Sequence, residues 1–197
     1  MNSPHELDAS VAAPRTNNPL DRGRPLLERE QALTVLDRCV AEATASSGSI
    51  CLISGEAGIG KTSLVRHAAS RSAGTVRWIS GGCDPLFTPR ALGPLHDIAR
   101  QTGGVLAERL FTGASKESIA AGLLDTIDGE HQPTVLVIED LHWADEATLD
   151  LLLFVGRRIA SRPAALVVTY RDEAGEERLH GAVCGRKTDT SSPFCGR

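Results

Sequence analysis

The sequence predicts an α/β fold in which a parallel sheet lies between two layers of helices. Four short apolar runs have the length of strands, helical patterns separate them, and the runs lack polar alternation. Strands that are buried on both faces and alternate with helices form a parallel sheet with right-handed crossovers. A chain of 197 residues is long enough to bury one sizeable core.

The first half of the chain predicts two helices and two strands. Residues 26–44 repeat apolar side chains at three- and four-residue steps, which predicts a helix, and residues 50–54 form the first strand. A glycine-rich loop then leads into a helix that runs to about residue 70, and residues 75–80 form the second strand. The side chains expected to point inward from the two helices are those of Leu33, Leu36, Val40, Ala43, Leu64, Val65 and Ala68.

The second half begins with a loop and a helix within residues 81–104, and this helix is expected to be interrupted at Pro94. A near-continuous β-branched run then predicts a strand that is buried on both faces. Asp145 is expected to cap the helix that follows this strand. The remaining elements are expected as a helix at 116–127, a strand at 134–140, a helix at 146–159 and a strand at 164–170.

Composition sets the domain organisation and excludes several classes of protein. Residues 1–20 are expected to be a disordered leader, 21–173 the core, and 174–197 a poorly ordered tail. The net charge of -4, without a block of Lys and Arg, predicts no DNA binding by this chain itself. The cysteines lack metal-site spacing, and no signal peptide or membrane span is present, so a cytoplasmic protein without a membrane partner is expected.

The segment GEAGIGKT, residues 55–62, matches the phosphate-loop pattern G-x-x-x-x-G-K-[ST] between a predicted strand and a predicted helix. Glycines let successive backbone N–H groups point into one concavity, and the helix adds its positive N-terminal end. Lys61 is expected to contact the β- and γ-phosphates, and the Thr62 hydroxyl is expected to bind Mg²⁺. The expected phosphate-binding residues are Gly55, Glu56, Ala57, Gly58, Ile59, Gly60, Lys61, Thr62 and Ser63.

Two carboxylates, Glu139 and Asp140, end the third predicted strand at the edge where ligands of open α/β sheets bind. Glu139 is the candidate Mg²⁺ ligand alongside Thr62, and Asp140 is the candidate catalytic group that polarises the attacking water. These two roles are interchangeable at this stage, because the sequence fixes the order of the acids but not the direction of their side chains. Arg171, directly after the fourth strand, is a candidate for contacting the γ-phosphate, with a solvated loop arginine as the alternative.

Three residues near these motifs could have either a structural role or a role in the site. Asp145 is more readily a helix cap than a catalytic group. His142 and Trp143 suit packing as well as they suit a site.

Together, five segments of the chain resemble the ATPase module of the AAA/STAND class, above all the one at the N-terminus of large bacterial LuxR-family transcriptional regulators. The resemblance covers about residues 24–173. It implies binding of ATP with Mg²⁺, weak hydrolysis to ADP and phosphate at most, a regulatory role and self-association through the module. It also makes Leu27, Glu28 and Arg29 candidates for adenine contacts. The segments are PLLEREQALTVL, GEAGIGKTSLV, GGCDPLFTPRALGPLHDIA, VLVIEDLHWADEATLDLLLFVGRRI and ALVVTYRDE.

The sequence also departs from this family. The regulators continue with a fifth core strand, a helical lid, a sensor region and a helix-turn-helix, whereas the resemblance stops near Glu173. We therefore expect a truncated three-layer P-loop NTPase core without the fifth strand and the lid, ending in a native or frame-shifted tail. Two alternatives stay open: a nucleotide-binding switch without turnover, and a non-functional fragment.

Overall fold

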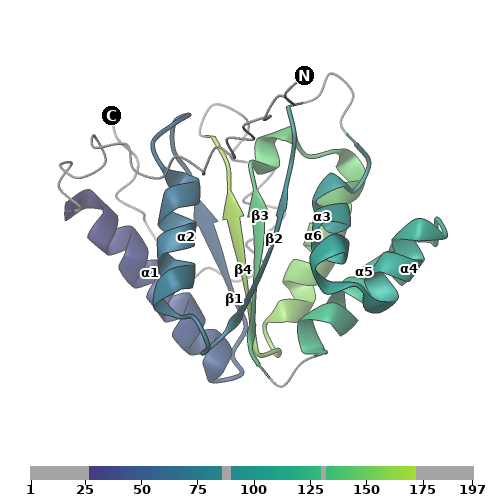
Figure 1. Ribbon diagram of the computed structural model, residues 1–197, viewed down its shortest axis with the longest axis horizontal. Coiled ribbons are helices and arrows are strands. Elements are labelled where there is room, and N and C mark those ends of the chain that lie inside the picture. The colour runs from purple at the N-terminus through teal and green to yellow at the C-terminus, as the bar shows by residue number, and fades with distance from the viewer. Residues whose placement is uncertain (1–26, 86–89, 130–131, 172–197) are drawn as a thin grey trace, which may run out of the picture.

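The structure is a computed structural model that describes residues 27–85, 90–129 and 132–171, with side chains from residue 30 onward. The leader and tail predicted at 1–20 and 174–197 lie outside these described residues. The elements, labelled in Figure 1, are α1 (Leu27–Thr44), β1 (Ser49–Ile53), α2 (Lys61–Arg71), β2 (Arg77–Gly82), α3 (Gly93–Thr102), α4 (Gly104–Phe111), α5 (Lys116–Asp128), β3 (Thr134–Glu139), the 3-10 helix η2 (Leu141–Trp143), α6 (Glu146–Ile159) and β4 (Ala164–Thr169).

The predicted α/β fold is confirmed. Four parallel strands form one sheet in the order β1-β4-β3-β2. Figure 1 shows α1 and α2 on one face of this sheet and α3 to α6 on the other, so the sheet is the middle of three layers. Each strand lies within two residues of its predicted bounds. Among the described residues, no helix is long and apolar enough to cross a membrane.

The two central strands are buried on both faces, as their apolar runs predict. Val135 and Val137 of β3 pack in the core beneath α1 and α2. Their neighbours Leu136 and Ile138 pack in the core beneath α3 to α6. This alternation follows from the two-residue period of a strand, and it explains why both faces need apolar side chains. The seven side chains predicted to point inward from α1 and α2 are all buried: Leu33, Leu36, Val40, Ala43, Leu64, Val65 and Ala68.

The structure corrects two local predictions and adds one helix. Pro94 lies in the first turn of α3 and does not interrupt the helix. The N–H groups of the first turn have no partner within a helix, so the missing N–H of a proline costs nothing there. A short helix that the sequence did not predict, α4, follows directly after α3. Asp145 precedes α6 as predicted, but its carboxylate caps no backbone group of this helix. It accepts hydrogen bonds from the Thr148 hydroxyl and, at 3.2 Å, from the N–H of Leu92.

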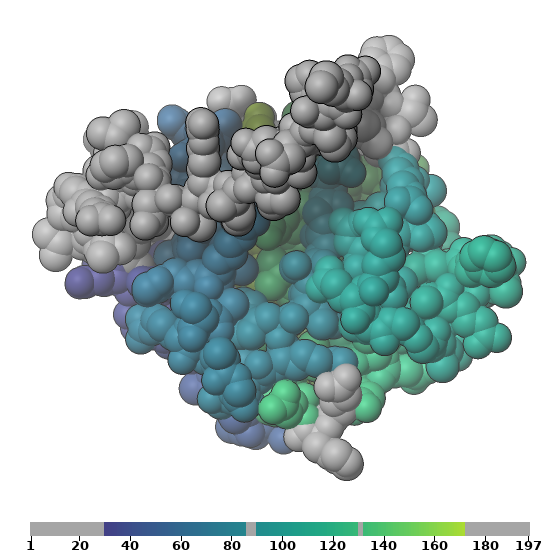
Figure 2. Space-filling view, viewed as in Figure 1, coloured from purple at the N-terminus to yellow at the C-terminus, as the bar shows by residue number. Residues whose placement is uncertain are grey.

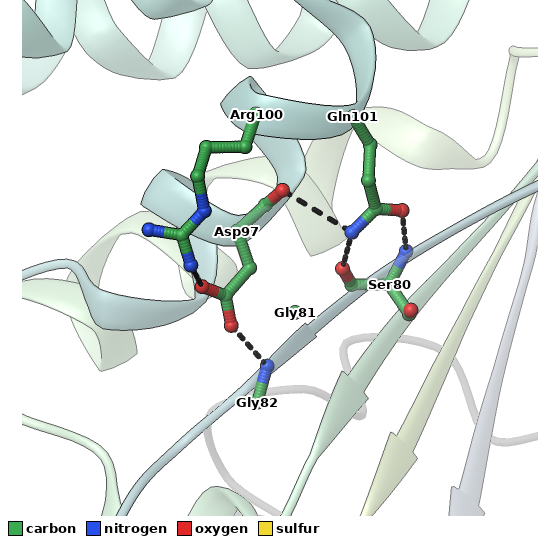
Figure 3. A pocket seen from close by; sticks show the side chains of 6 residues that line it. All are labelled: Ser80, Gly81, Gly82, Asp97, Arg100 and Gln101. Carbon is green, nitrogen blue, oxygen red and sulfur yellow. Dashed lines mark hydrogen bonds and ion pairs between the residues drawn. The ribbon is translucent and has the colours of Figure 1, made fainter. Parts of the chain in front are cut away.

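The two edge strands of the sheet differ in how they are covered. Among the described strands, β2 is paired only with β3, and its other edge faces α3 (Figure 3). There the amide of Gln101 bonds both the N–H and the C=O of Ser80, and the carboxylate of Asp97 accepts from the N–H of Gly82 at 3.1 Å. Side chains of α3 thus bond three backbone groups of this edge, which hinders its pairing with another strand.

Strand β1 forms the other edge and pairs only with β4 among the described strands. The loop that follows β1 lies at the carboxyl edge of the sheet, where all four parallel strands end. In the view of Figure 2, the surfaces of α2 and of α3 to α5 lie on either side of β2.

Candidate functional site

The loop between β1 and α2 has the backbone geometry of an anion cradle. Gly55, Gly58 and Gly60 all adopt positive φ angles, of 148°, 76° and 100°. Residues with a side chain rarely adopt such angles, so the loop can curl in this way only because glycine occupies these positions. Gly60 is the N-cap of α2 and supplies no side-chain cap, which leaves the positive end of the helix directed into the loop.

Lys61 folds back over this loop. Its Nζ donates to the carbonyl oxygens of Gly55 at 2.7 Å and Glu56 at 3.0 Å. These contacts hold the ammonium group inside the curve of the loop, where the charge of a phosphate would be met. The phosphate contacts expected of Lys61 stay a prediction.

Thr62 and Glu139 are brought together from different elements. The Thr62 hydroxyl, at the start of α2, donates to Glu139 Oε2, at the end of β3, at 2.6 Å. The two residues are 77 positions apart in the sequence, so this contact depends on the order of strands in the sheet. A hydroxyl and a carboxylate in contact are the oxygen ligands that Mg²⁺ takes from proteins when phosphates and water complete its shell.

The carboxyl ends of the strands are tied to one another by hydrogen bonds beyond the sheet. Asp140 has a φ of 55°, and its N–H donates to Thr169 Oγ1, at the end of β4, at 3.0 Å. The N–H of Cys83 donates to the carbonyl of Glu139 at 2.9 Å, and the N–H of Tyr170 donates to that of Ile53 at 3.0 Å. The loops that carry Glu139 and Asp140 are thereby fixed relative to the phosphate loop.

Asp140 turns the chain out of β3 into η2. Within the part of the chain that the structure describes, its carboxylate accepts no hydrogen bond, so it is free to meet a ligand. The left-handed conformation is one that aspartate tolerates better than most residues, and such backbone angles gather at functional sites.

Arg171, Trp143 and His142 form a group beside Asp140. The guanidinium carbon of Arg171 lies 5.9 Å from the centroid of the Trp143 ring, and the His142 ring centroid lies 5.1 Å from that of Trp143. The side chain of Arg171 is thus directed to the region after β3, where Asp140 also lies.

Carboxylates dominate the electrostatics near the ends of β2 and β3. Burial, followed by the negative charges of Asp145, Asp140, Asp84 and Asp97, raises the pKa of the Cys83 thiol to about 12. A thiol with this pKa stays protonated at neutral pH, and the protonated form is a poor nucleophile. Negative charge beside the positive phosphate loop would attract the cation of a ligand that binds as an anion together with a cation.

The residues present fit a nucleotide with Mg²⁺ better than a metal ion alone. Across the described ranges, no cluster of three or more His, Cys, Asp and Glu side chains could hold a metal. Thr62 and Glu139 could hold Mg²⁺ directly or through water, which would leave the other positions to phosphate oxygens and water, the arrangement that Mg²⁺ adopts at phosphate sites. The glycine cradle and Lys61 supply the matching contacts for the phosphates.

Some functional positions carry little signal in the sequence. Thr169 bonds the backbone of Asp140, and the only hint of this is a polar residue that ends an apolar strand. The bond from Leu92 to Asp145 joins α3 to the start of α6, and no motif predicts it. The side chains of Leu27, Glu28 and Arg29, the predicted adenine contacts, lie outside the described residues.

Comparisons with known proteins agree with this geometry. Residues 25–168 match the AAA ATPase domain family. The chain is 27% identical to an uncharacterized protein of Rhizobium meliloti (strain 1021) over 203 aligned positions, which cover 81% of this chain and 20% of that protein. The chain thus spans about a fifth of the length of this relative.

Two solved structures share the fold. Cdc6p from Pyrobaculum aerophilum has a TM-score of 0.55 at 19% identity, covering 77% of this chain and 41% of that one. The Aeropyrum pernix Orc1 protein, solved in complex with DNA, has a TM-score of 0.54 at 20% identity, covering 79% of this chain and 42% of that one. Because the family match takes in the phosphate loop, both strand-end acids and the sheet as far as Val168, the chain belongs to the AAA ATPase domain family, which implies nucleotide binding.

Proposed function

We propose that this chain binds Mg-ATP in the loop formed by residues 55–62 and hydrolyses it weakly at most. The observation that carries the proposal is the 2.6 Å contact between Thr62 and Glu139, which places a hydroxyl and a carboxylate together beside the loop. A glycine-rich turn with an incidental lysine would not require this partner from a strand far away in the sequence. The preference for ATP rests on the family.

Lys61 and the loop amides would neutralise the phosphates. Lys61 Nζ now bonds two loop carbonyls, and on binding it would exchange these for charge-assisted bonds to β- and γ-phosphate oxygens. The open end of α2 would bring its first N–H groups to the same oxygens.

Thr62 and Glu139 would hold Mg²⁺, which when bound neutralises the charge that develops on the phosphates. The hydrogen bond that joins these two residues would give way to metal contacts, Thr62 directly and Glu139 through water. Asp140, the residue after Glu139, would orient the attacking water, and Arg171 would contact the γ-phosphate. Since Glu139 and Asp140 follow one another in the chain, the hydrolysis experiment below tests whether Asp140 serves the water.

The binding half of the proposal is tested by calorimetric titration of the purified chain with Mg-ATP, Mg-ADP and Mg-GTP. Loss of a charge-assisted hydrogen bond costs about 1.5–3 kcal/mol, so Lys61→Ala should weaken Mg-ATP binding by roughly 10- to 100-fold. Lys116→Ala is the matched control, because Lys116 makes an exposed ion pair with Asp150 on the α5–α6 side. Equal affinities for the two variants would contradict the phosphate-loop assignment.

The hydrolysis half is tested by phosphate release from Mg-ATP. Asp140→Asn should lower the rate while leaving Mg-ATP affinity within a few-fold, because the carboxylate is assigned to the water and not to the nucleotide. Asp150→Asn, at an exposed carboxylate of α6, is the control. If wild type and Asp140→Asn release phosphate at the same rate, Asp140 is not catalytic; if wild type releases none, binding without turnover becomes the better account.

We infer a regulatory role, with the chain acting as the nucleotide-dependent part of a longer transcription regulator, from the LuxR-family resemblance. The net charge of -4 supports the expectation that this chain does not itself bind DNA. Fluorescence anisotropy with labelled duplex DNA at low salt tests it, and salt-dependent binding would contradict it. Self-association through the module stays a prediction, which analytical ultracentrifugation with and without Mg-ATP would check.

A further inference from the structure

Thr169 is the last residue of β4 and the polar end of a strand that is otherwise apolar. Only 1% of its surface is exposed, so contact with solvent does not explain a hydroxyl at this position. The hydroxyl oxygen, Oγ1, accepts a hydrogen bond from the N–H of Asp140 at 3.0 Å. Thr169 is therefore in contact with the residue to which the proposed function assigns the attacking water.

This hydrogen bond takes the place of a backbone contact between β3 and β4. At the other end of the two strands, the N–H of Thr134 donates to the carbonyl of Pro163 at 2.9 Å. Asp140 and Thr169 have the same separation in the chain as these two residues, so in a regular parallel ladder the N–H of Asp140 would meet the carbonyl of Thr169. It meets the side chain of Thr169 instead, and the pairing of β3 with β4 ends at Ile138.

The exchange of acceptor lets the chain leave the sheet at Asp140. A ladder bond would keep this residue extended, whereas its φ of 55° and ψ of 45° are left-handed. A side chain that offers another acceptor to a backbone N–H competes with regular secondary structure in this way. In a residue other than glycine, such angles persist only where surrounding contacts hold them, and the direction of the side chain depends on them.

We propose that Thr169 is a positioning residue for hydrolysis, whose hydroxyl holds Asp140 in the left-handed conformation that directs its carboxylate to the attacking water. The proposal rests on the proposed function and adds a residue that acts through Asp140, without a contact to the nucleotide. A valine would fill nearly the same space as Thr169. It would leave the N–H of Asp140 to the backbone carbonyl or without a partner, and the carboxylate would lose its fixed direction.

The test compares phosphate release and Mg-ATP affinity in wild type, Thr169→Val and Thr169→Ser. Thr169→Val should lower the rate at saturating Mg-ATP by about tenfold, the effect of one hydrogen bond, and keep the affinity within about twofold. Thr169→Ser keeps the hydroxyl and should retain most of the rate. Equal rates in all three proteins would overturn the proposal. So would weaker Mg-ATP binding at an unchanged rate, because the hydroxyl would then act on the nucleotide itself.

A double-mutant cycle with Asp140→Asn separates positioning from a general structural effect. If Thr169 acts through the Asp140 carboxylate, Thr169→Val should lower the rate by no more than Asp140→Asn does, and should add nothing in the Asp140→Asn background. A general structural defect would instead lower the rate by the same factor in both backgrounds, which would contradict the positioning role. Thr169→Ala removes the same hydroxyl and takes the place of Thr169→Val in the cycle if the valine variant does not fold.

Thr134 supplies a matched control at the opposite end of the sheet. It is also fully buried, and its hydroxyl donates to the carbonyl of Ile127 at 3.1 Å. Thr134→Val should lower the midpoint of urea unfolding but leave the rate of phosphate release unchanged. If Asp140→Asn slows release and Thr169→Val does not, this inference alone fails. If wild type releases no phosphate, the proposed hydrolysis fails, and this inference with it.

Discussion

The Thr62 hydroxyl links α2 to β3 through its hydrogen bond to Glu139, and we propose that it binds Mg²⁺. Thr62→Ala should remove most of the enhancement that Mg²⁺ gives to ATP affinity, whereas Thr62→Ser, which keeps the hydroxyl, should retain it. Titrations with ATP in Mg²⁺ and in EDTA measure this enhancement. An unchanged Mg²⁺ dependence in Thr62→Ala would exclude Thr62 as a ligand.

Single residues also show what the sequence can and cannot predict. The spacing of Gly55, Gly60 and Lys61 predicts the loop because backbone geometry and charge depend on those residue types directly. The sequence leaves His142 open between packing and a role in the site, because whether a ring nitrogen finds a partner depends on the side chains that surround it in space. A motif can be recognised from the sequence alone, whereas the hydrogen-bond partners of a buried side chain cannot.

Among the elements, the close packing of α3 on β2 gives a matched pair of substitutions on one strand (Figure 3). A Cβ at Gly81 would lie 2.1 Å from the backbone oxygen of Pro94, whereas a Cβ at Gly82 would meet nothing within 4 Å. Gly81→Ala should therefore force α3 away from β2 and lower the free energy of unfolding by about 1–3 kcal/mol or more. Gly82→Ala should be close to neutral. Urea unfolding measures both, and similar values for the two variants would contradict this packing.

Elements with a strong apolar pattern were predictable, and the helix with a weak pattern was not. The strands β3 and β4 are continuous apolar runs and lie close to their predicted bounds. Helix α4 has eight residues between glycines and one fully buried anchor, Leu106, which is too little pattern to recognise in the sequence. The role of Pro94 depended on where α3 begins, and the bond from Leu92 to Asp145 across two elements fixes that start.

At the scale of the whole molecule, the site joins the ends of β1, β3 and β4 with the start of α2, so a bound nucleotide should stabilise the entire fold. At a concentration 100 times the dissociation constant, a ligand that binds only the folded state adds about 2.7 kcal/mol. For a domain of this size, that predicts a rise of roughly 5–10 °C in the melting temperature. Thermal melts with Mg-ATP measure the shift, Lys61→Ala should show little of it, and a shift of equal size in that variant would point to another site.

The most direct test of the account is a crystal structure of the chain with Mg²⁺ and a non-hydrolysable ATP analogue. We predict that the triphosphate lies in the loop 55–62, that Lys61 Nζ has left the carbonyls of Gly55 and Glu56 for phosphate oxygens, and that Mg²⁺ stands between Thr62 and Glu139. A nucleotide bound elsewhere, or a loop that keeps its present contacts at saturating analogue, would contradict the central claim.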